Sequence, residues 1–167
     1  KMKADGVLEN YKPTVFDELV NPFDDYDGTF TAARLGTLGI TYNKDKISAA
    51  PTQWSDLTKP EFTNAFGIAD PALSGTSYMS IALLQKQFGW EFFEKLAANQ
   101  TRIGKGAGQV IDDTSSGELA ACLGVDYITN NKVNKGAHVA LAYPPELLVV
   151  PSPVAIFKES NNMDAAK

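Results

Sequence analysis

The 167-residue sequence has little of several features that would point to particular classes of protein. It contains one cysteine, Cys122, and one histidine, His138. A single thiol cannot form an internal disulfide bond, so the cysteine content gives no information about the redox compartment. Lys and Arg number 15 against 20 Asp and Glu, for a net charge of −5. The basic residues form no cluster, which argues against a nucleic-acid-binding protein.

Long apolar runs and catalytic motifs are also missing. No stretch approaches the roughly 18 residues of a membrane-spanning helix, and the longest candidate, 147–156, is interrupted by Pro151 and Pro153. No metal-ligand spacing and no G-x-S-x-G nucleophile motif occurs. His138 opens a predicted strand and Cys122 lies inside an apolar one, where we expect an inert buried thiol. The sequence therefore predicts no catalysis, no metal site and no cofactor.

Two further motifs are incomplete or depend on context. The segment FDDYDGTF, 23–30, is similar to a calcium loop, but Phe23 stands at the first ligand position and Arg34 where the closing Glu belongs. We interpret it as an acidic surface turn. Asn-Gln-Thr at 99–101 is a glycosylation sequon, which has meaning only in a eukaryotic secretory context.

From about residue 65 onward, short apolar segments alternate with helical segments of about ten residues. This alternation predicts an α/β fold, a three-layer sandwich with a mainly parallel sheet. The segment LAACLG, 119–124, is continuously apolar, as buried parallel strands are. The predicted strands are 29–35, 38–42, 65–69, 101–104, 119–124, 138–143 and 149–158, and the predicted helices include 75–87, 90–99 and 125–133.

Three predicted strand-to-helix junctions are rich in small or polar residues. They are ADPALSGTSY at 69–78, RIGKGAGQ at 102–109 and LGVDY at 123–127. The carboxyl ends of strands in an open parallel sheet lie at one edge, and ligands bind there. We therefore expect a crevice lined by the N-termini of three helices.

The first junction has the properties of an anion site. Ser74 or Thr76 can cap the following helix, whose free N–H groups carry about half a positive charge. No acidic residue occurs between Asp70 and Glu91 to neutralise that charge. A phosphate or carboxylate would fit at this helix end, although a simple N-cap explains the same residues. The residues from 78 to 84 are expected to anchor the helix in the core.

The other two junctions allow both a binding and a structural interpretation. GKGAGQ at 104–109 fits neither the dinucleotide fingerprint nor the P-loop, because Gln109 stands where a third glycine is needed. We interpret it as a close-approach turn in which the amides of Gly106 and Ala107 face the ligand. Asp126 and Tyr127 at the third junction either contact an amine or hydroxyl of a ligand, or are an N-cap and a packed ring.

Eight segments, in this order and spacing, resemble the second lobe of an extracytoplasmic solute-binding protein of an ABC transporter. The similarity is strongest to the branch that binds ferric iron, phosphonates and sugar phosphates, and it covers almost the whole chain. The segments are ADGVLENYKP, GTLGITYNKDKI, PTQWSDLTKPEF, IADPALSGTSY, FGWEFFEKLAAN, GAGQVIDDTSSGELA, DYITNNKVNKGAHVALAYP and VVPSPVAIFKESNNMDAAK.

The resemblance implies a two-lobed protein that closes around a small solute and delivers it to a membrane permease. Residues 1–167 would form a single α/β lobe, with a crossover segment at about 29–43, while the first lobe and the C-terminal helices would lie outside the chain. The protein would be periplasmic or otherwise extracytoplasmic, either soluble or as a lipoprotein. A dimer or an exchange of lobes is compatible with an isolated lobe, since its hinge face would be exposed.

The resemblance also assigns roles to the junction residues. Ser74, Gly75 and Thr76 are similar to the turn at which relatives bind the anionic part of the ligand. Asp126 and Tyr127 match the position where iron-binding relatives carry two adjacent tyrosines. A single tyrosine is an incomplete set for ferric iron, so a phosphorylated sugar or a phosphonate is expected, with its polar or amino tail near Asp126.

Other interpretations remain open at this point. Arg34 is a further candidate anion partner, and a side chain that faces solvent is the alternative interpretation. A ferric-iron-binding protein of the same family is the first alternative. A small α/β enzyme that handles phosphate, or a signalling domain built on the same fold, follows it.

Overall fold

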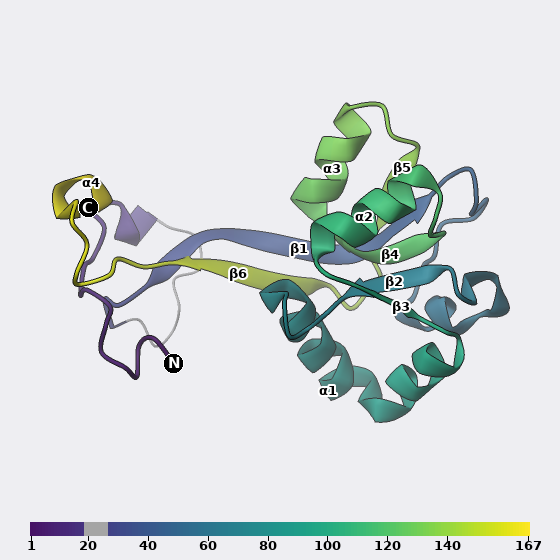
Figure 1. Ribbon diagram of the computed structural model, residues 1–167, viewed down its shortest axis with the longest axis horizontal. Helices are drawn as coiled ribbons and strands as arrows, with labels where there is room; N and C mark the ends of the chain where they lie inside the picture. The colour runs from purple at the N-terminus through teal and green to yellow at the C-terminus, as the bar shows by residue number, and fades with distance from the viewer. Residues whose placement is uncertain (19–26) are drawn as a thin grey trace. The chain divides into compact units, whose positions relative to one another are not determined.

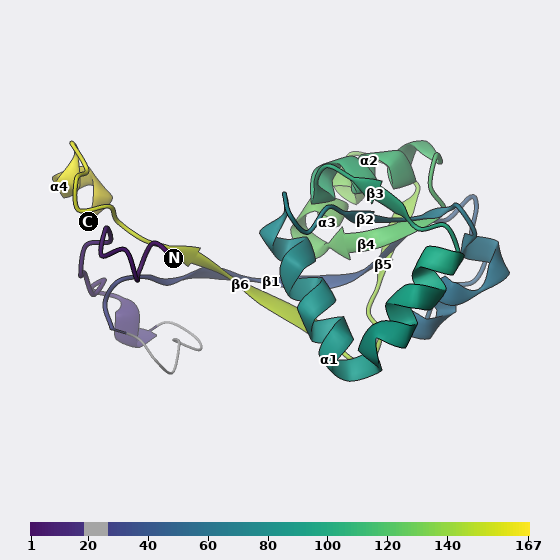
Figure 2. The same ribbon diagram turned by 60° about the horizontal axis from the view of Figure 1, so that its bottom comes forward.

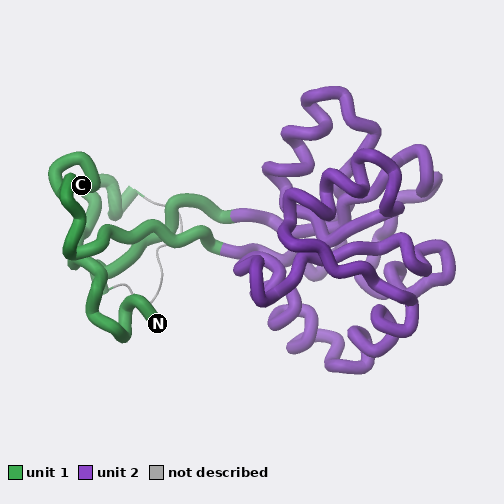
Figure 3. The backbone as a smooth tube through the Cα atoms, in the orientation of Figure 1, with its two compact units in different colours: residues 1–35, 151–167 green, residues 36–150 purple. Residues whose placement is uncertain are grey.

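The computed structural model describes residues 1–18 and 27–167 and divides into two compact units (Figure 3). Unit 1 comprises residues 1–35 and 151–167, and unit 2 comprises residues 36–150. Unit 1 contains the 3-10 helix Phe16–Glu18 and the short C-terminal helix α4, Met163–Ala166. Its two chain segments meet at a bridge between Leu8 and Phe157.

The chain forms a six-stranded sheet of order β3-β2-β4-β1-β5, with β6 paired to β1; β2 to β5 lie in unit 2, while β1 and β6 also include residues of unit 1. β2 is parallel to β3 and β4, whereas β1 is antiparallel to β4 and β5. Four strands, β2 to β5, therefore point in the same direction. The strands are β1 Thr31–Asn43, β2 Phe66–Ala69, β3 Arg102–Gly104, β4 Ala121–Val125, β5 Val139–Ala142 and β6 Leu148–Val154.

The α/β class is confirmed, with one correction to the sheet. β1 runs against its neighbours in the middle of a sheet that was expected to be mainly parallel. An antiparallel neighbour needs no helical crossover, so β1 enters the sheet directly from the preceding chain. β1 is also one strand of 13 residues, whereas two segments separated near Gly36 were expected.

Helices cover both faces of the sheet and make three layers (Figures 1 and 2). α1, Gly75–Ala98, lies on one face, and α2, Ala107–Ser116, and α3, Asp126–Asn134, lie on the other. Gly89 has φ 70°, a left-handed conformation that kinks α1. The two helices predicted on either side of Gly89 are therefore confirmed as the two halves of α1.

The core-facing side of α1 differs from the expected one. Ser77, Ser80 and Leu84 are buried, at a spacing that follows the helical repeat. Tyr78 is 63% exposed and Met79 39% exposed, because both lie on the opposite side of the helix. Residues 78–84 therefore do not all anchor the helix, as the apolar run had suggested. The main core residues are Leu38, Ile40, Trp54, Leu57, Phe62, Phe66, Leu84, Phe92, Val110, Ile111, Leu119 and Leu123.

On the opposite face of the sheet, buried polar side chains connect β1 to the helices. The hydroxyl groups of Thr41 and Thr129 are 2.6 Å apart, and Asn43 donates through Nδ2 to the Thr114 carbonyl at 2.9 Å. Cys122 is fully buried beside them, and burial raises the pKa of its thiol to about 12. This confirms the interpretation of Cys122 as an inert thiol.

The sequon at 99–101 has a structural role in this fold. Asn99 donates through Nδ2 to the carbonyls of Leu57 and Lys59, at 3.1 and 3.0 Å, and accepts from the Thr63 hydroxyl. These bonds connect the end of α1 to the 3-10 helices Trp54–Thr58 and Pro60–Phe62. The side-chain amide that glycosylation would modify is therefore engaged in the fold.

The calcium-like segment lies partly outside the described residues, since 23–26 belong to the range that is not described. Asp27 accepts from the hydroxyl and N–H groups of Thr29 and pairs with Lys3 at 2.9 Å. The Thr29 bonds and Lys3 lower the pKa of Asp27 to about 2. Within residues 1–18 and 27–167, no helix combines the length and the apolar character needed to cross a lipid bilayer.

Candidate ligand-binding edge of the sheet

The three junctions predicted from the sequence lie side by side at one edge of the sheet. β3, β2 and β4 are adjacent and parallel, and they lead into α2, α1 and α3 respectively. The Asp70 N–H donates to the Gly104 carbonyl at 2.7 Å and joins the first two junctions directly. We call this the carboxyl edge: residues 70–76, 104–107, 126–127 and 143.

At the start of α1, Ser74 is the N-cap and its hydroxyl accepts from the Ser77 N–H at 3.3 Å. The Ser74 N–H itself donates to the Asp70 carbonyl at 2.9 Å. Among the described residues, no protein acceptor is found for the N–H groups of Gly75 and Thr76. No acidic residue lies in the first turn, and an added Cβ at Gly75 would meet no atom within 4 Å. This helix end is therefore open and positively charged, and the nearest carboxylate in the chain is that of Asp70, which accepts from the Ala72 N–H at 2.8 Å in the preceding turn.

The start of α2 has the same character. Its N-cap is Gly106, which offers no side-chain hydrogen bond, and its first turn contains no acidic residue. An added Cβ at Gly106 or Gly108 would also meet no atom within 4 Å. The Gln109 side chain accepts instead from the Lys105 N–H at 2.9 Å and so shapes the turn. The adjacent strands β2 and β3 thus both lead into helices, α1 and α2, whose first turns carry no acidic side chain at the carboxyl edge.

The start of α3 carries its own negative charge. Asp126 accepts from the Thr37 N–H through Oδ2 at 3.1 Å and from the Tyr127 N–H through Oδ1 at 2.6 Å. Asp126 is the first residue of α3 rather than its N-cap, which is Val125, and its carboxylate remains half-buried at the edge. Tyr127 is 40% exposed and is not the packed ring of the structural alternative.

Tyr143 also lies at this edge and was missed by the sequence reasoning. It directly follows β5, and its ring lies over Gly39 of β1, 3.2 Å from the position a Cβ would take there. The pKa of Tyr143 is raised by burial and by the charge of Asp126. The signal was available, because Tyr143 stands at the carboxyl end of a predicted strand, but no glycine-rich junction follows it.

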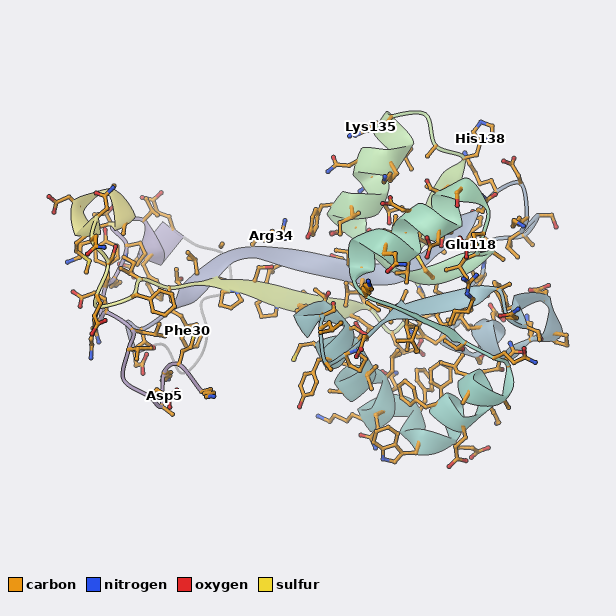
Figure 4. The ribbon with its side chains drawn as sticks, in the orientation of Figure 1. Asp5, Phe30, Arg34, Glu118, Lys135 and His138 are labelled. Carbon is orange, nitrogen blue, oxygen red and sulfur yellow. The ribbon has the colours of Figure 1, made fainter. Side chains whose placement is uncertain are left out.

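Arg34 lies in unit 1, whereas the other candidate residues lie in unit 2. It lies on the part of β1 that belongs to unit 1, and its Nε atom donates to the Ser152 hydroxyl at 3.4 Å (Figure 4). The single histidine of the sequence, His138, lies with Lys135 beyond the C-terminal end of α3 (Figure 4) and contacts Asp45 at 3.3 Å. Among the described residues, no three His, Cys, Asp or Glu side chains gather in a way that could hold a metal ion.

A hollow in unit 2 lies away from these residues. It is lined by Lys46, Ile47, Ser48, Ala49, Glu61, Ala65 and Ala120. Ala65 and Ala120 precede β2 and β4, so this hollow is at the amino ends of those strands. The charged helix ends are at the opposite edge, and we therefore take the carboxyl edge as the candidate site.

Comparison with known proteins finds relatives at 25–26% identity. The chain is 26% identical over 147 residues to the phosphoglycerate transport regulatory protein PgtC of Salmonella typhimurium, covering 83% of this chain and 37% of that protein. The periplasmic binding protein AfuA of Actinobacillus pleuropneumoniae, solved with fructose-6-phosphate bound, is 26% identical with a TM-score of 0.89. Iron-bound HitA of Pseudomonas aeruginosa is 25% identical with a TM-score of 0.76.

The chain spans about half the length of these solved relatives. It is covered to 99% in both structural comparisons, but accounts for 56% of AfuA and 57% of HitA. These relatives are binding proteins rather than enzymes, which agrees with the prediction of no catalysis.

The family model for bacterial extracellular solute-binding proteins matches residues 1–167. This family comprises proteins that bind small solutes outside the cytoplasm. Since the match extends over the whole chain, the chain belongs to the bacterial extracellular solute-binding protein family.

Proposed function

We propose that the chain is the ligand-binding lobe of an ABC-transporter substrate-binding protein that captures a small anionic solute. The solute is a phosphorylated sugar or a phosphonate, held at the carboxyl edge of the sheet. One observation carries the proposal. The helices α1 and α2 follow the adjacent strands β2 and β3, and neither has an acidic side chain in its first turn.

The electrostatics of the edge favour an anion at α1 and α2 but not at α3. Each helix N-terminus contributes about half a positive charge, and anions at such ends gain typically 0.3–1 kcal/mol. The N–H groups of Gly75 and Thr76 are directed donors for phosphate oxygens. Asp126 repels an anion at α3 and instead favours the amino or hydroxyl groups of the ligand tail.

The compounds named for two relatives support the proposal of an anionic ligand. AfuA was solved with fructose-6-phosphate, and PgtC is named for phosphoglycerate transport. Both compounds are phosphorylated, and both proteins are 26% identical to this chain.

We further propose that the chain works within a longer, two-lobed protein. Its coverage of 56% of AfuA is consistent with one lobe and part of a second. Residues 29–43 would lie at the crossover, since β1 begins in unit 1 and ends in unit 2. The complete protein would act in the periplasm, as a soluble protein or lipoprotein, and deliver its solute to a membrane permease.

Ferric iron is the second candidate ligand, because HitA, at 25% identity, was solved with iron bound. The arrangement here is less suitable for iron. The carboxylate of Asp126 already accepts two backbone N–H bonds and that of Asp70 accepts one, from Ala72, while the position after Asp126 offers one tyrosine, Tyr127. Ferric iron needs several hard anionic oxygen ligands.

Isothermal titration calorimetry of the full-length protein separates these ligands. Fructose 6-phosphate or aminoethylphosphonate should bind with high affinity, and ferric iron should not. Substitution Thr76→Glu, which places a carboxylate at the helix end, should abolish binding of the phosphorylated solute. Tight binding of iron with no heat from either phosphorus compound would overturn the proposal.

A further inference from the structure

The carboxyl edge continues past the two helix ends to Asp126 and Tyr143, which lie on either side of β1. Asp126 faces Thr37 of β1, whose N–H it accepts at 3.1 Å. Tyr143 lies opposite Gly39, one residue beyond the register pair of Ile40 and Ala142. The two side chains therefore come from strands that are separated only by β1.

The two residues lie on the same face of the sheet as α3. Side chains alternate along a strand, so Gly39 shares its face with Thr41. The Thr41 hydroxyl contacts the Thr129 hydroxyl of α3 at 2.6 Å. The ring of Tyr143 over Gly39 therefore lies on the α3 side, near the first turn that contains Asp126.

Gly39 makes this arrangement possible. A Cβ at Gly39 would clash with the Ala142 carbonyl oxygen and press on the Tyr143 ring at 3.2 Å. With no side chain at Gly39, the Cδ1 edge of the Tyr143 ring fits beside Leu141 against β1, while 48% of Tyr143 remains exposed. An exposed aromatic ring on a fixed support can stack against an apolar face of a ligand.

The neighbouring carboxylate still has hydrogen-bonding capacity. An ionised carboxylate offers about four lone-pair sites, and backbone N–H groups occupy two of those of Asp126. The raised pKa of Tyr143 keeps its phenol protonated, so the hydroxyl can donate as well as accept. A ring with several hydroxyl groups is complementary to such a pair, whereas a bare anion is not.

We propose that Tyr143 and Asp126 form a second subsite that recognises the hydroxyl-bearing part of the solute. This inference rests on the proposed function, because it assumes that the phosphoryl group lies at α1 and α2. It also specifies the solute class as a sugar phosphate rather than a simple phosphonate. Tyr143 thereby acts as a specificity-determining residue.

The strand spacing makes the two subsites experimentally separable. β2 and β5 are three strand positions apart in the order β2-β4-β1-β5, which corresponds to about 14 Å at 4.7–4.9 Å per strand. Inorganic phosphate bound at Gly75 and Thr76 therefore cannot reach Tyr143. A sugar phosphate extending along the edge contacts Asp126 first and Tyr143 beyond it.

The test compares inorganic phosphate and fructose 6-phosphate in NMR titrations of the chain and its Tyr143 variants. Tyr143→Phe removes one hydroxyl and should weaken fructose 6-phosphate roughly three- to tenfold, with inorganic phosphate unchanged. Tyr143→Ala should weaken the sugar phosphate by about tenfold or more. Trp90→Ala, at another exposed aromatic of unit 2, is the matched control and should change neither affinity. The dispersion of the amide spectrum reports whether each variant is folded.

The titrations give different results when the second subsite is wrong and when the anion site is wrong. If fructose 6-phosphate shifts the amides of Gly75 and Thr76 but both Tyr143 variants bind it normally, the second subsite is wrong and the anion site stands. If neither compound shifts those amides, the anion site is wrong, and the second subsite, which depends on it, is wrong too. Equal weakening of both compounds by Tyr143→Phe would also overturn the inference.

Discussion

Replacing Gly75 by aspartate should raise stability and abolish anion binding at the same time. Gly75 is the first residue of α1, is exposed, and has open space where a Cβ would be. Its backbone is not in the left-handed region, so a side chain is tolerated. An aspartate there places a carboxylate at the positively charged helix N-terminus and occupies the proposed anion position.

The size of the expected stabilisation follows from the charge at the helix end. Compared with the neutral control Gly75→Asn, the carboxylate should contribute about 0.3–1 kcal/mol to the free energy of unfolding. For a chain of this size that corresponds to a rise in Tm of about 1–4 °C. The aspartate is favoured in its charged form, so its folded-state pKa falls below the unfolded value of about 3.9. The gain is therefore present above about pH 4 and is lost as the pH falls through the folded-state pKa.

Thermal unfolding followed by circular dichroism, at pH 7 and pH 3, measures the stability difference between the two variants. A phosphate titration followed by amide chemical shifts measures binding. We expect the Asn variant to retain phosphate binding and the Asp variant to lose it. If the Asp variant is no more stable than the Asn variant at pH 7, or still binds phosphate at the same amides, the electrostatic account of this helix end is refuted.

Three other substitutions test the fold that supports the edge. Asn99→Ala removes three side-chain hydrogen bonds and should lower the free energy of unfolding by about 1–3 kcal/mol in urea denaturation; an unchanged midpoint contradicts that role. Gly39→Ala should clash with the Ala142 carbonyl and lower Tm by several degrees, whereas a neutral result means the ring and strand can shift. Desolvation raises the pKa of Asp56, but its bonds to Lys59 and to two backbone N–H groups outweigh that and lower it to about 2. Its stabilisation is thus complete above about pH 4 and lost as the pH falls toward 2, so Asp56→Asn should be less stable than the wild type at pH 7 and show less acid sensitivity in that window.

Local signals in the sequence were sufficient for much of the fold. The break at Gly89 and the cap at the start of α1 depend on residues within one helical turn; two helices on either side of Gly89 and a cap at Ser74 or Thr76 were predicted, and the structure has the cap at Ser74. The three junctions could be placed at one edge because parallel strands with helical crossovers share a direction. The role of Cys122 as a buried thiol followed from its continuous apolar strand.

The features that were missed depend on contacts between distant segments. The reversal of β1 is determined by its pairing with β4 and β5, about 80 and 100 residues later, which no local pattern specifies. Tyr143 becomes a candidate only because its ring meets Gly39 across that pairing. Tyr78 was assigned to the core because the apolar run around it conceals which side of the helix is buried, and the buried side includes serines instead.

The most direct test of the central claim is a phosphate titration of the isotopically labelled chain, followed by amide chemical shifts. The account predicts saturable, salt-sensitive shifts at Gly75 and Thr76, accompanied by shifts at residues 107 and 108 of α2. It predicts no comparable change at the amides near His138. Shifts distributed over exposed lysines, with Gly75 and Thr76 unmoved, would contradict the claim that the helix ends of α1 and α2 form the anion site.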